Sequence, residues 1–249
     1  MTKGLQIIGT ASILGAVVVA AVLVNDYRGA APVSQYTQPK GVRAVQKEGP
    51  LGCDFSGTDS PIITGTMPRA GKKSVDLQVP RAYLIGPIYP KDGQLASNGA
   101  LLMRMHAFSF MPYPPGGAAS NGSQRDELML LLTQLRPLAE VTDFAATFHS
   151  GAPQGTQFEE VRQANGLIKY KYVPRPMRKE TYIGREAGEI TDVITCGVNN
   201  FPAVQITPNC EHLTSAHGVD IILTYFSEQL EHWRVLKGNA QKFVECIAK

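Results

Sequence analysis

The sequence predicts an α+β fold with an antiparallel, β-rich domain and a C-terminal helix. Three observations carry this prediction. Residues 219–226 are a run of β-branched and aromatic side chains that is too short for an independent buried helix, so they predict a central strand. Residues 227–247 repeat apolar side chains every three or four positions, as one stripe of a helix does. Asn165 and Gly166 separate two strand patterns and both accept positive φ, which predicts a hairpin.

The N-terminal region has a different character from the rest of the chain. Residues 5–24 contain no charged side chain, and a helix of about twenty residues at 1.5 Å per residue crosses a hydrocarbon core of about 30 Å. A removed signal peptide has a shorter apolar region of about 7–15 residues. We therefore predict that residues 1–28 form one transmembrane helix that stays attached as a membrane anchor, with a cleaved signal segment as the alternative.

The remaining chain divides by composition. Residues 29–51 lack apolar periodicity and contain three prolines in the tract that follows residue 29, which predicts a flexible tether. Residues 52–249 then form the extracytoplasmic α+β domain, either as one body or as two lobes, 52–152 and 153–249. The net charge of +3 and the pI of about 8.6 come from scattered charges, so the sequence argues against nucleic acid as a partner.

Within the domain, further strand patterns occur at residues 62–63, 75–79, 100–110, 127–135, 158–162, 167–173 and 189–196. In residues 100–110, Leu101 and Met103 share one face, whereas Arg104 and His106 share the other. The pattern predicts that His106 is a polar surface residue. Residues 138–148 fit either a strand or a short helix.

The cysteines indicate the compartment. All four follow the apolar segment, and their even number favours disulfides in an oxidising compartment. Cys196 and Cys210, with His212 and His217, could bind zinc, but the Cys-x-x-Cys pair that usually starts such a site is absent. We therefore predict a disulfide between Cys196 and Cys210, which leaves Cys53 to pair with Cys246. The expected location is a periplasmic domain anchored in the inner membrane by residues 5–24.

Catalytic signatures are absent from the sequence. It has no Gly-x-Ser-x-Gly nucleophile elbow, no pair of histidines around a glutamate as in helical zinc hydrolases, and no phosphate-binding glycine loop with its lysine. The sequence therefore predicts a protein without catalytic residues, metal or cofactor.

A pattern in the last quarter of the chain suggests a family. It consists of Cys196, Pro208-Asn209-Cys210-Glu211-His212, Val219-Asp220-Ile221, Leu230 with Trp233, and Phe243-Val244-Glu245-Cys246. Together with the apolar N-terminal segment and the β-rich body, this pattern resembles that of periplasmic immunity proteins of type VI secretion lipase effectors. The resemblance implies a protein that is not an enzyme, binds a secreted lipase effector in the periplasm and blocks the entrance to its active site.

The expected partner contacts lie on a long irregular segment that begins at Met111. Loops of this length are commonly functional, although a plain surface excursion between strands is the alternative. We select Met111, Tyr113, Pro114 and Arg125 as partner-binding candidates. The second functional hypothesis is a membrane-anchored structural or assembly subunit of a bacterial envelope complex, because small side chains within residues 5–24 would allow close helix packing.

Overall fold

The computed structural model describes residues 50–52, 55, 60–69, 72–85, 100–113, 126–134, 137–172, 179–198 and 208–249. The chain divides into two compact units, Met1–Val45 and Gln46–Lys249, and all described residues belong to the second. The predicted membrane helix and nearly all of the predicted tether lie outside the described residues. In the part of the chain that is described, no helix is long and apolar enough to cross a membrane.

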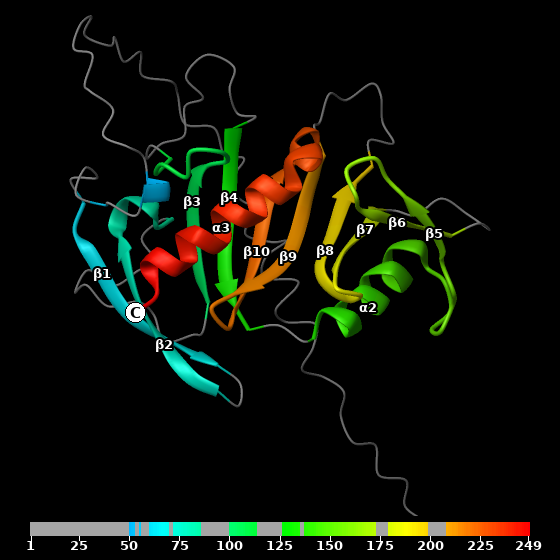
Figure 1. Ribbon diagram of the computed structural model, residues 1–249, viewed down its shortest axis with the longest axis horizontal. Helices are drawn as coiled ribbons and strands as arrows, with labels where there is room; N and C mark the ends of the chain where they lie inside the picture. The colour runs from blue at the N-terminus through cyan, green and yellow to red at the C-terminus, as the bar shows by residue number, and fades with distance from the viewer. Residues whose placement is uncertain are drawn as a thin grey trace, which may run out of the picture. The chain divides into compact units, whose positions relative to one another are not determined.

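An eight-stranded antiparallel sheet forms the body of the second unit, in the order β3-β4-β10-β9-β8-β7-β6-β5 (Figure 1). Its strands are β3 (Leu101–His106), β4 (Glu127–Thr133), β5 (Glu159–Arg162), β6 (Ile168–Lys171), β7 (Lys179–Glu186), β8 (Glu189–Gly197), β9 (Asn209–Ala216) and β10 (Val219–Phe226). A separate hairpin joins β1 (Ile62–Arg69) to β2 (Lys72–Pro80). The antiparallel α+β prediction is confirmed, and one sheet continues across residue 152 because β4 pairs with β10.

In the part of the chain that the structure describes, the remaining elements are two α-helices and three short 3-10 helices. They are α2 (Leu138–Ser150), α3 (Trp233–Ile247), η2 (Pro50–Gly52), η4 (Arg81–Tyr83) and η7 (Ser227–His232). The ambiguous segment at 138–148 is therefore a helix. The C-terminal helix starts later than its sequence suggests, because residues 227–232 first make a 3-10 helix and the α-helix begins at Trp233.

Turn chemistry explains the hairpins between β5 and β6 and between β9 and β10. Gly166 has a φ of 83°, and the Asn165 side chain accepts a hydrogen bond from the Leu167 amide at 3.2 Å, so the predicted hairpin forms between β5 and β6. His217 and Gly218 both have positive φ between β9 and β10. Two such residues in succession match the twist of the flanking strands and hold their register.

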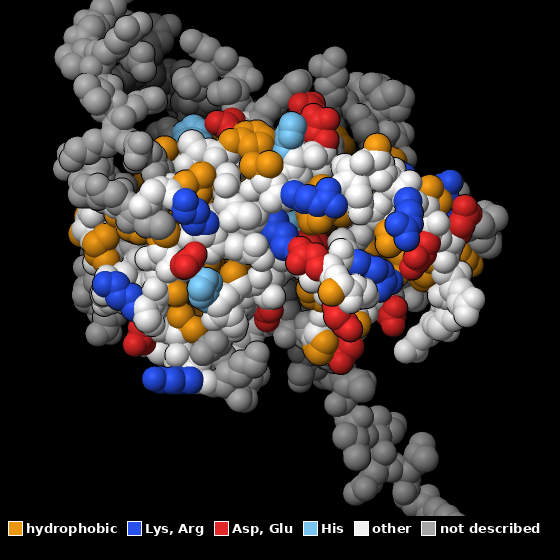
Figure 2. Space-filling model, viewed as in Figure 1, with side chains coloured by type: hydrophobic (Ala, Val, Ile, Leu, Met, Phe, Trp, Pro, Cys, Tyr) orange, Lys and Arg blue, Asp and Glu red, His pale blue; other side chains and the backbone are white. Residues whose placement is uncertain are grey.

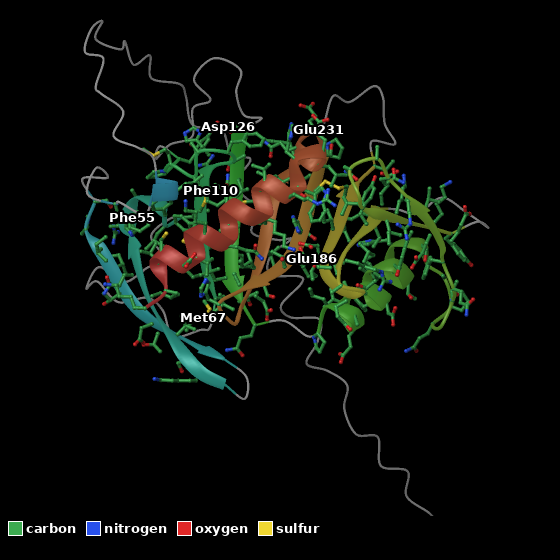
Figure 3. The ribbon with its side chains drawn as sticks, viewed as in Figure 1. Phe55, Met67, Phe110, Asp126, Glu186 and Glu231 are labelled. Carbon is green, nitrogen blue, oxygen red and sulfur yellow. A yellow bond between two sulfur atoms is a disulfide. The ribbon has the colours of Figure 1, made fainter. Side chains whose placement is uncertain are left out.

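The first face of the sheet carries the main core. Residues paired directly across neighbouring strands point to the same face, and one such buried row consists of Met103, Leu130, Leu223, His212, Ile194 and Tyr182. Helix α3 covers this face, because its Lys237 reaches Asp192, two residues before Ile194 on β8. Aromatic rings close one end of the core: Phe55 and Phe110 lie 6.0 and 5.9 Å from the Phe243 ring on α3 (Figure 3).

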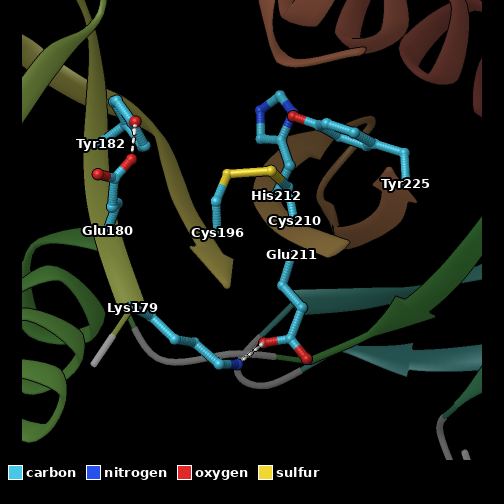
Figure 4. The surroundings of a disulfide bond; sticks show 8 residues. All are labelled: Lys179, Glu180, Tyr182, Cys196, Cys210, Glu211, His212 and Tyr225. Carbon is cyan, nitrogen blue, oxygen red and sulfur yellow. Dashed lines mark hydrogen bonds and ion pairs between the residues drawn. A yellow bond between two sulfur atoms is a disulfide. The ribbon is translucent and has the colours of Figure 1, made fainter. Parts of the chain in front are cut away.

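Helix α2 packs on the second face, over β7 and β8. Lys179 and Glu211 lie on this face, where they pair at 3.8 Å (Figure 4). His149 of α2 faces the same lysine: burial, and then the Lys179 charge, lower the pKa of His149 to about 4. The helix packs closely through small side chains, since its buried residues are Thr142, Ala145, Ala146 and Ser150. The two α-helices therefore stabilise opposite faces of one sheet.

Strands β7 and β9 are not among the strands that the sequence predicts. The sequence suggested His212 only as a possible zinc ligand, yet its side chain is buried within β9. The inward side chains of this strand are Cys210, His212 and Thr214. Their polarity hides the apolar alternation by which a strand is recognised.

Candidate partner-binding surface

The four predicted partner contacts have different environments. The Met111 side chain is 39% exposed, in the turn that follows β3. The Tyr113 side chain is 7% exposed and so differs from the exposed anchor that the sequence suggested. Pro114 and Arg125 lie outside the described residues.

Tyr113 is buried because the chain folds back along the edge of β3. Pro112 forms an isolated antiparallel bridge with Met105, and the Tyr113 amide donates to the Arg104 carbonyl at 3.4 Å. The Tyr113 ring then lies 4.3 Å from the Arg104 guanidinium carbon and 4.9 Å from the His106 ring. These contacts already occupy the aromatic surface that a partner would need.

Charged residues surround Tyr113 on the second face of the sheet. Arg104 pairs with Glu127 at 2.5 Å, and His106 contacts Asp126 at 2.9 Å. Both pairs are partly exposed, so the prediction that His106 is a polar surface residue is consistent with its position. Exposed pairs of this kind contribute about 0–1 kcal/mol to stability, and their carboxylates and cations remain accessible to a partner.

A small hollow adjoins these pairs at the same end of β4, β9 and β10. It has a volume of about 90 Å³ and is lined by Glu127, Met129, Asn209, Thr224, Tyr225 and Phe226. Pockets for drug-sized ligands measure roughly 300–1,000 Å³. The hollow is therefore smaller than the pockets that hold drug-sized ligands.

The turn between β3 and Pro112 joins this region to α3. Phe108 is exposed, its ring lies 5.6 Å from the His232 ring, and its carbonyl accepts a hydrogen bond from Asn239 at 3.1 Å. We call Phe108 and Met111 the turn patch. In Figure 2, hydrophobic side chains gather along the upper edge of the view. The structure thus provides a contact surface at this end of the sheet.

The arrangement that most resembles acid–base machinery lies elsewhere, beneath α3. Asp192 accepts hydrogen bonds from His212 at 2.8 Å, from Lys237 at 2.8 Å and from Thr191 at 2.7 Å, and the Tyr225 hydroxyl is 3.5 Å from the second ring nitrogen of His212. Lys237 also pairs with Glu186 at 2.7 Å. We call Asp192, His212 and Lys237 the buried polar cluster.

The charges of the buried polar cluster stabilise the contact between α3 and the sheet. Burial would raise the pKa of Asp192, but the hydrogen bonds from His212, Lys237 and Thr191 and the charge of His212 outweigh burial and lower that pKa to about 2. Burial opposes the charge of Lys237, yet Asp192 and Glu186 raise the pKa of its amine. The side chains of Asp192 and His212 are 0% exposed, so no substrate reaches them. The cluster ties α3 to β8.

Cys196 and Cys210 form the predicted disulfide and not a zinc site. Cys196 and Cys210 are directly opposite on β8 and β9, with Cα atoms 4.0 Å apart, and they form a disulfide (Figure 4). Cys246 is also disulfide-bonded, and its predicted partner Cys53 lies outside the described residues. Among the described residues, no group of three or more His, Cys, Asp and Glu side chains could hold a metal ion.

Comparison with known proteins identifies a structure with a similar fold. No protein-family model and no curated protein matches the chain. The structure is similar to that of Smlt3025, an immunity protein of the Stenotrophomonas maltophilia type IV secretion system, with a TM-score of 0.55 and 16% identity over 77% of this chain and 94% of that chain. The chain shares its fold with a bacterial immunity protein. The iron-regulated outer membrane lipoprotein FrpD of Neisseria meningitidis has a TM-score of 0.42 and 13% identity over 74% of this chain and 93% of that one.

The similarity to Smlt3025 supports an immunity-protein-like fold, as the resemblance implied. The secretion system named for Smlt3025 is of type IV, whereas the resemblance in the last quarter of the chain pointed to type VI. Sequence reasoning also missed the buried polar cluster. The available signals were Asp192 inside an apolar strand and Lys237 on the apolar stripe of the C-terminal helix.

Proposed function

We propose that the chain is an immunity protein that binds a secreted toxin and neutralises it. The observation that carries this proposal is the shared fold, which extends over 94% of the chain of an immunity protein. Inhibition requires a rigid scaffold that presents contact groups, whereas catalysis requires an accessible nucleophile and base. The described acid–base set is sealed under α3, while the turn patch and the neighbouring charged pairs are accessible.

The finer parts of the proposal concern the toxin and the compartment. The sequence resemblance supports a lipase effector of a type VI system as the toxin, inhibited by a domain that blocks its active-site entrance. The Cys196–Cys210 disulfide is typical of an oxidising compartment. A periplasmic domain held at the inner membrane by residues 5–24 would meet such a toxin beside the lipids that the toxin attacks.

Co-expression in a bacterial host tests the proposal. The product of the adjacent gene is directed to the periplasm, and survival is measured with the full chain and with a form that lacks residues 1–28. We expect survival only with the full chain. The purified domain should also inhibit lipolysis by that product when the two are mixed in equal amounts.

The controls separate the functional alternatives. When the neighbouring protein is catalytically inactive, the host should survive equally well whichever version of the chain is present. If neither version protects the host and mixing yields no complex, the immunity proposal is wrong. The membrane-anchored assembly subunit then becomes the better explanation, and its membrane partners can be recovered with the anchored chain after cross-linking.

A further inference from the structure

The outer surface of α2 carries an exposed aromatic pair that the fold does not use. Phe144 and Phe148 are 60% and 61% exposed, the highest values among the large hydrophobic side chains of the described residues. Their rings are 5.7 Å apart and stacked at 14°. Aromatic side chains of this size bury about 150–250 Å² each when they are fully covered, so the pair leaves on the order of 200 Å² of ring surface to solvent.

Packing of α2 does not require these rings. The helix contacts the sheet through its small buried side chains, among them Ala145 and Ala146, and Phe144 and Phe148 lie outside that set. Phenylalanine is also a poorer helix former than alanine at an exposed position. Neither the stability of the helix nor its docking on β7 and β8 explains two phenylalanines here. Aromatic residues, phenylalanine among them, are enriched in protein–protein interfaces relative to the rest of the surface.

The charges around the pair indicate what it binds. Glu140, Phe144 and Phe148 are spaced four residues apart and so form one ridge along the helix. Asp143 is exposed on the same helix, and burial together with Lys179 lowers the pKa of His149 to about 4, so His149 adds no positive charge at neutral pH. The ridge is therefore apolar with an acidic N-terminal end.

We propose that Phe144 and Phe148 are the anchor by which this chain docks into an apolar groove with a basic rim on the toxin. This inference rests on the proposed immunity function and names its contact. A second copy of this chain is a poorer occupant, because a two-fold contact through the ridge would bring Glu140 and Asp143 of both copies together. Anionic lipid headgroups would be repelled by the same two carboxylates.

The test uses the full chain, the toxin encoded beside it, and calorimetric or surface-based measurement of Kd. Phe144→Ala and Phe148→Ala should each weaken binding about 10-fold, and the double variant about 100-fold, as anchors at an interface centre do. Alanine favours the helix, so circular dichroism and the unfolding midpoint should be retained. Val235→Ala is the matched control, since Val235 is 52% exposed on the outer side of α3.

A charge reversal tests the acidic end separately. Glu140→Lys should slow association and reduce its dependence on salt, because rim charges act mainly on the association rate. Glu189→Lys is the control, because Glu189 is an exposed carboxylate at the start of β8. The difference in association rate between wild type and Glu140→Lys should vanish in 1 M salt, where charges more than about 3 Å apart are screened.

The outcomes distinguish this inference from the proposed function. If the wild-type chain neither binds nor protects, the proposed function fails. If it binds and the double phenylalanine variant binds equally well, the contact lies elsewhere and the α2 inference is overturned. Loss of binding confined to Met111→Ser would place the contact at the turn patch. A wild-type dimer that the double variant converts to a monomer would assign the pair to self-association, and wild-type binding to phosphatidylglycerol vesicles that the variant loses would assign it to the membrane.

Discussion

Replacing Asp192 by asparagine should remove the tie between α3 and the sheet. The wild-type carboxylate is fully buried and bonds to His212, Lys237 and Thr191. Breaking a buried ion pair by removing one partner costs about 3–5 kcal/mol. The lower end of this energy range applies to Asp192, because Lys237 keeps Glu186 as a second partner. We therefore expect Asp192→Asn to lower the free energy of unfolding by about 3 kcal/mol at pH 7.

The pH dependence of stability gives a second estimate of what the Asp192 carboxylate contributes to the free energy of unfolding. The carboxyl has a pKa of about 2 in the folded chain and an ordinary value of 3.8, and at about 1.4 kcal/mol per pKa unit this difference corresponds to about 2 kcal/mol. Because the folded-state pKa is lowered, this stabilisation is fully present above pH 4 and is lost as the pH falls toward 2. The difference between wild type and variant should shrink by that amount across this window. Protonation of His149 affects both proteins equally and cancels in the comparison.

Urea denaturation monitored by tryptophan fluorescence measures both effects. Trp233 is the only tryptophan of the chain, is buried, and its ring lies 6.1 Å from the His212 ring, so its emission reports whether α3 remains docked beside the buried polar cluster. Glu189→Gln removes an exposed carboxylate from the same strand. Its free energy of unfolding should stay within about 0.5 kcal/mol of the wild-type value. An Asp192→Asn protein within 1 kcal/mol of wild type at pH 7, or with an unchanged difference at pH 3, would refute the reasoning.

Two further perturbations test the sheet and its turns. Replacing Cys196 and Cys210 together by alanine should lower the free energy of unfolding by about 3 kcal/mol, because the bond closes a loop of 14 residues in the unfolded chain; an unchanged denaturation midpoint would contradict this. Gly166→Ala should destabilise by about 1–2 kcal/mol, since the residue has a φ of 83°. Gly238→Ala should stabilise by about 0.5–1 kcal/mol, because this exposed position in α3 leaves open space for a Cβ. Thermal denaturation of the two glycine variants should therefore show shifts of opposite sign.

Elements with a local signal could be predicted from the sequence. The apolar run of β10 and the Asn165-Gly166 turn are each specified by residues close together in the chain, and both agree with the structure. The disulfide between Cys196 and Cys210 followed from cysteine number and compartment. In each case the deciding property belongs to the residues themselves rather than to distant neighbours.

Features that depend on long-range pairing could not be predicted in the same way. Helix α2 lacked a clear apolar stripe, because its packing side is made of small residues and its phenylalanines face outward. Tyr113 was expected on an exposed loop, but Pro112 pairs with Met105 and turns the ring onto Arg104. The local composition of a loop does not specify which strand it folds back upon.

The position of β10 between β4 and β9 has a consequence for how the chain is made. Strands β5 to β10 can form as successive hairpins, but β4 ends at Thr133 and its inner partner begins only at Val219. During synthesis the β3–β4 hairpin must therefore wait for nearly the whole remaining chain, with the apolar edge of β4 unpaired. An exposed apolar edge of this kind pairs readily with other chains. A chaperone that shields β4 until β10 emerges would raise the yield of folded protein, and a shortened chain that stops before β10 would aggregate through β4.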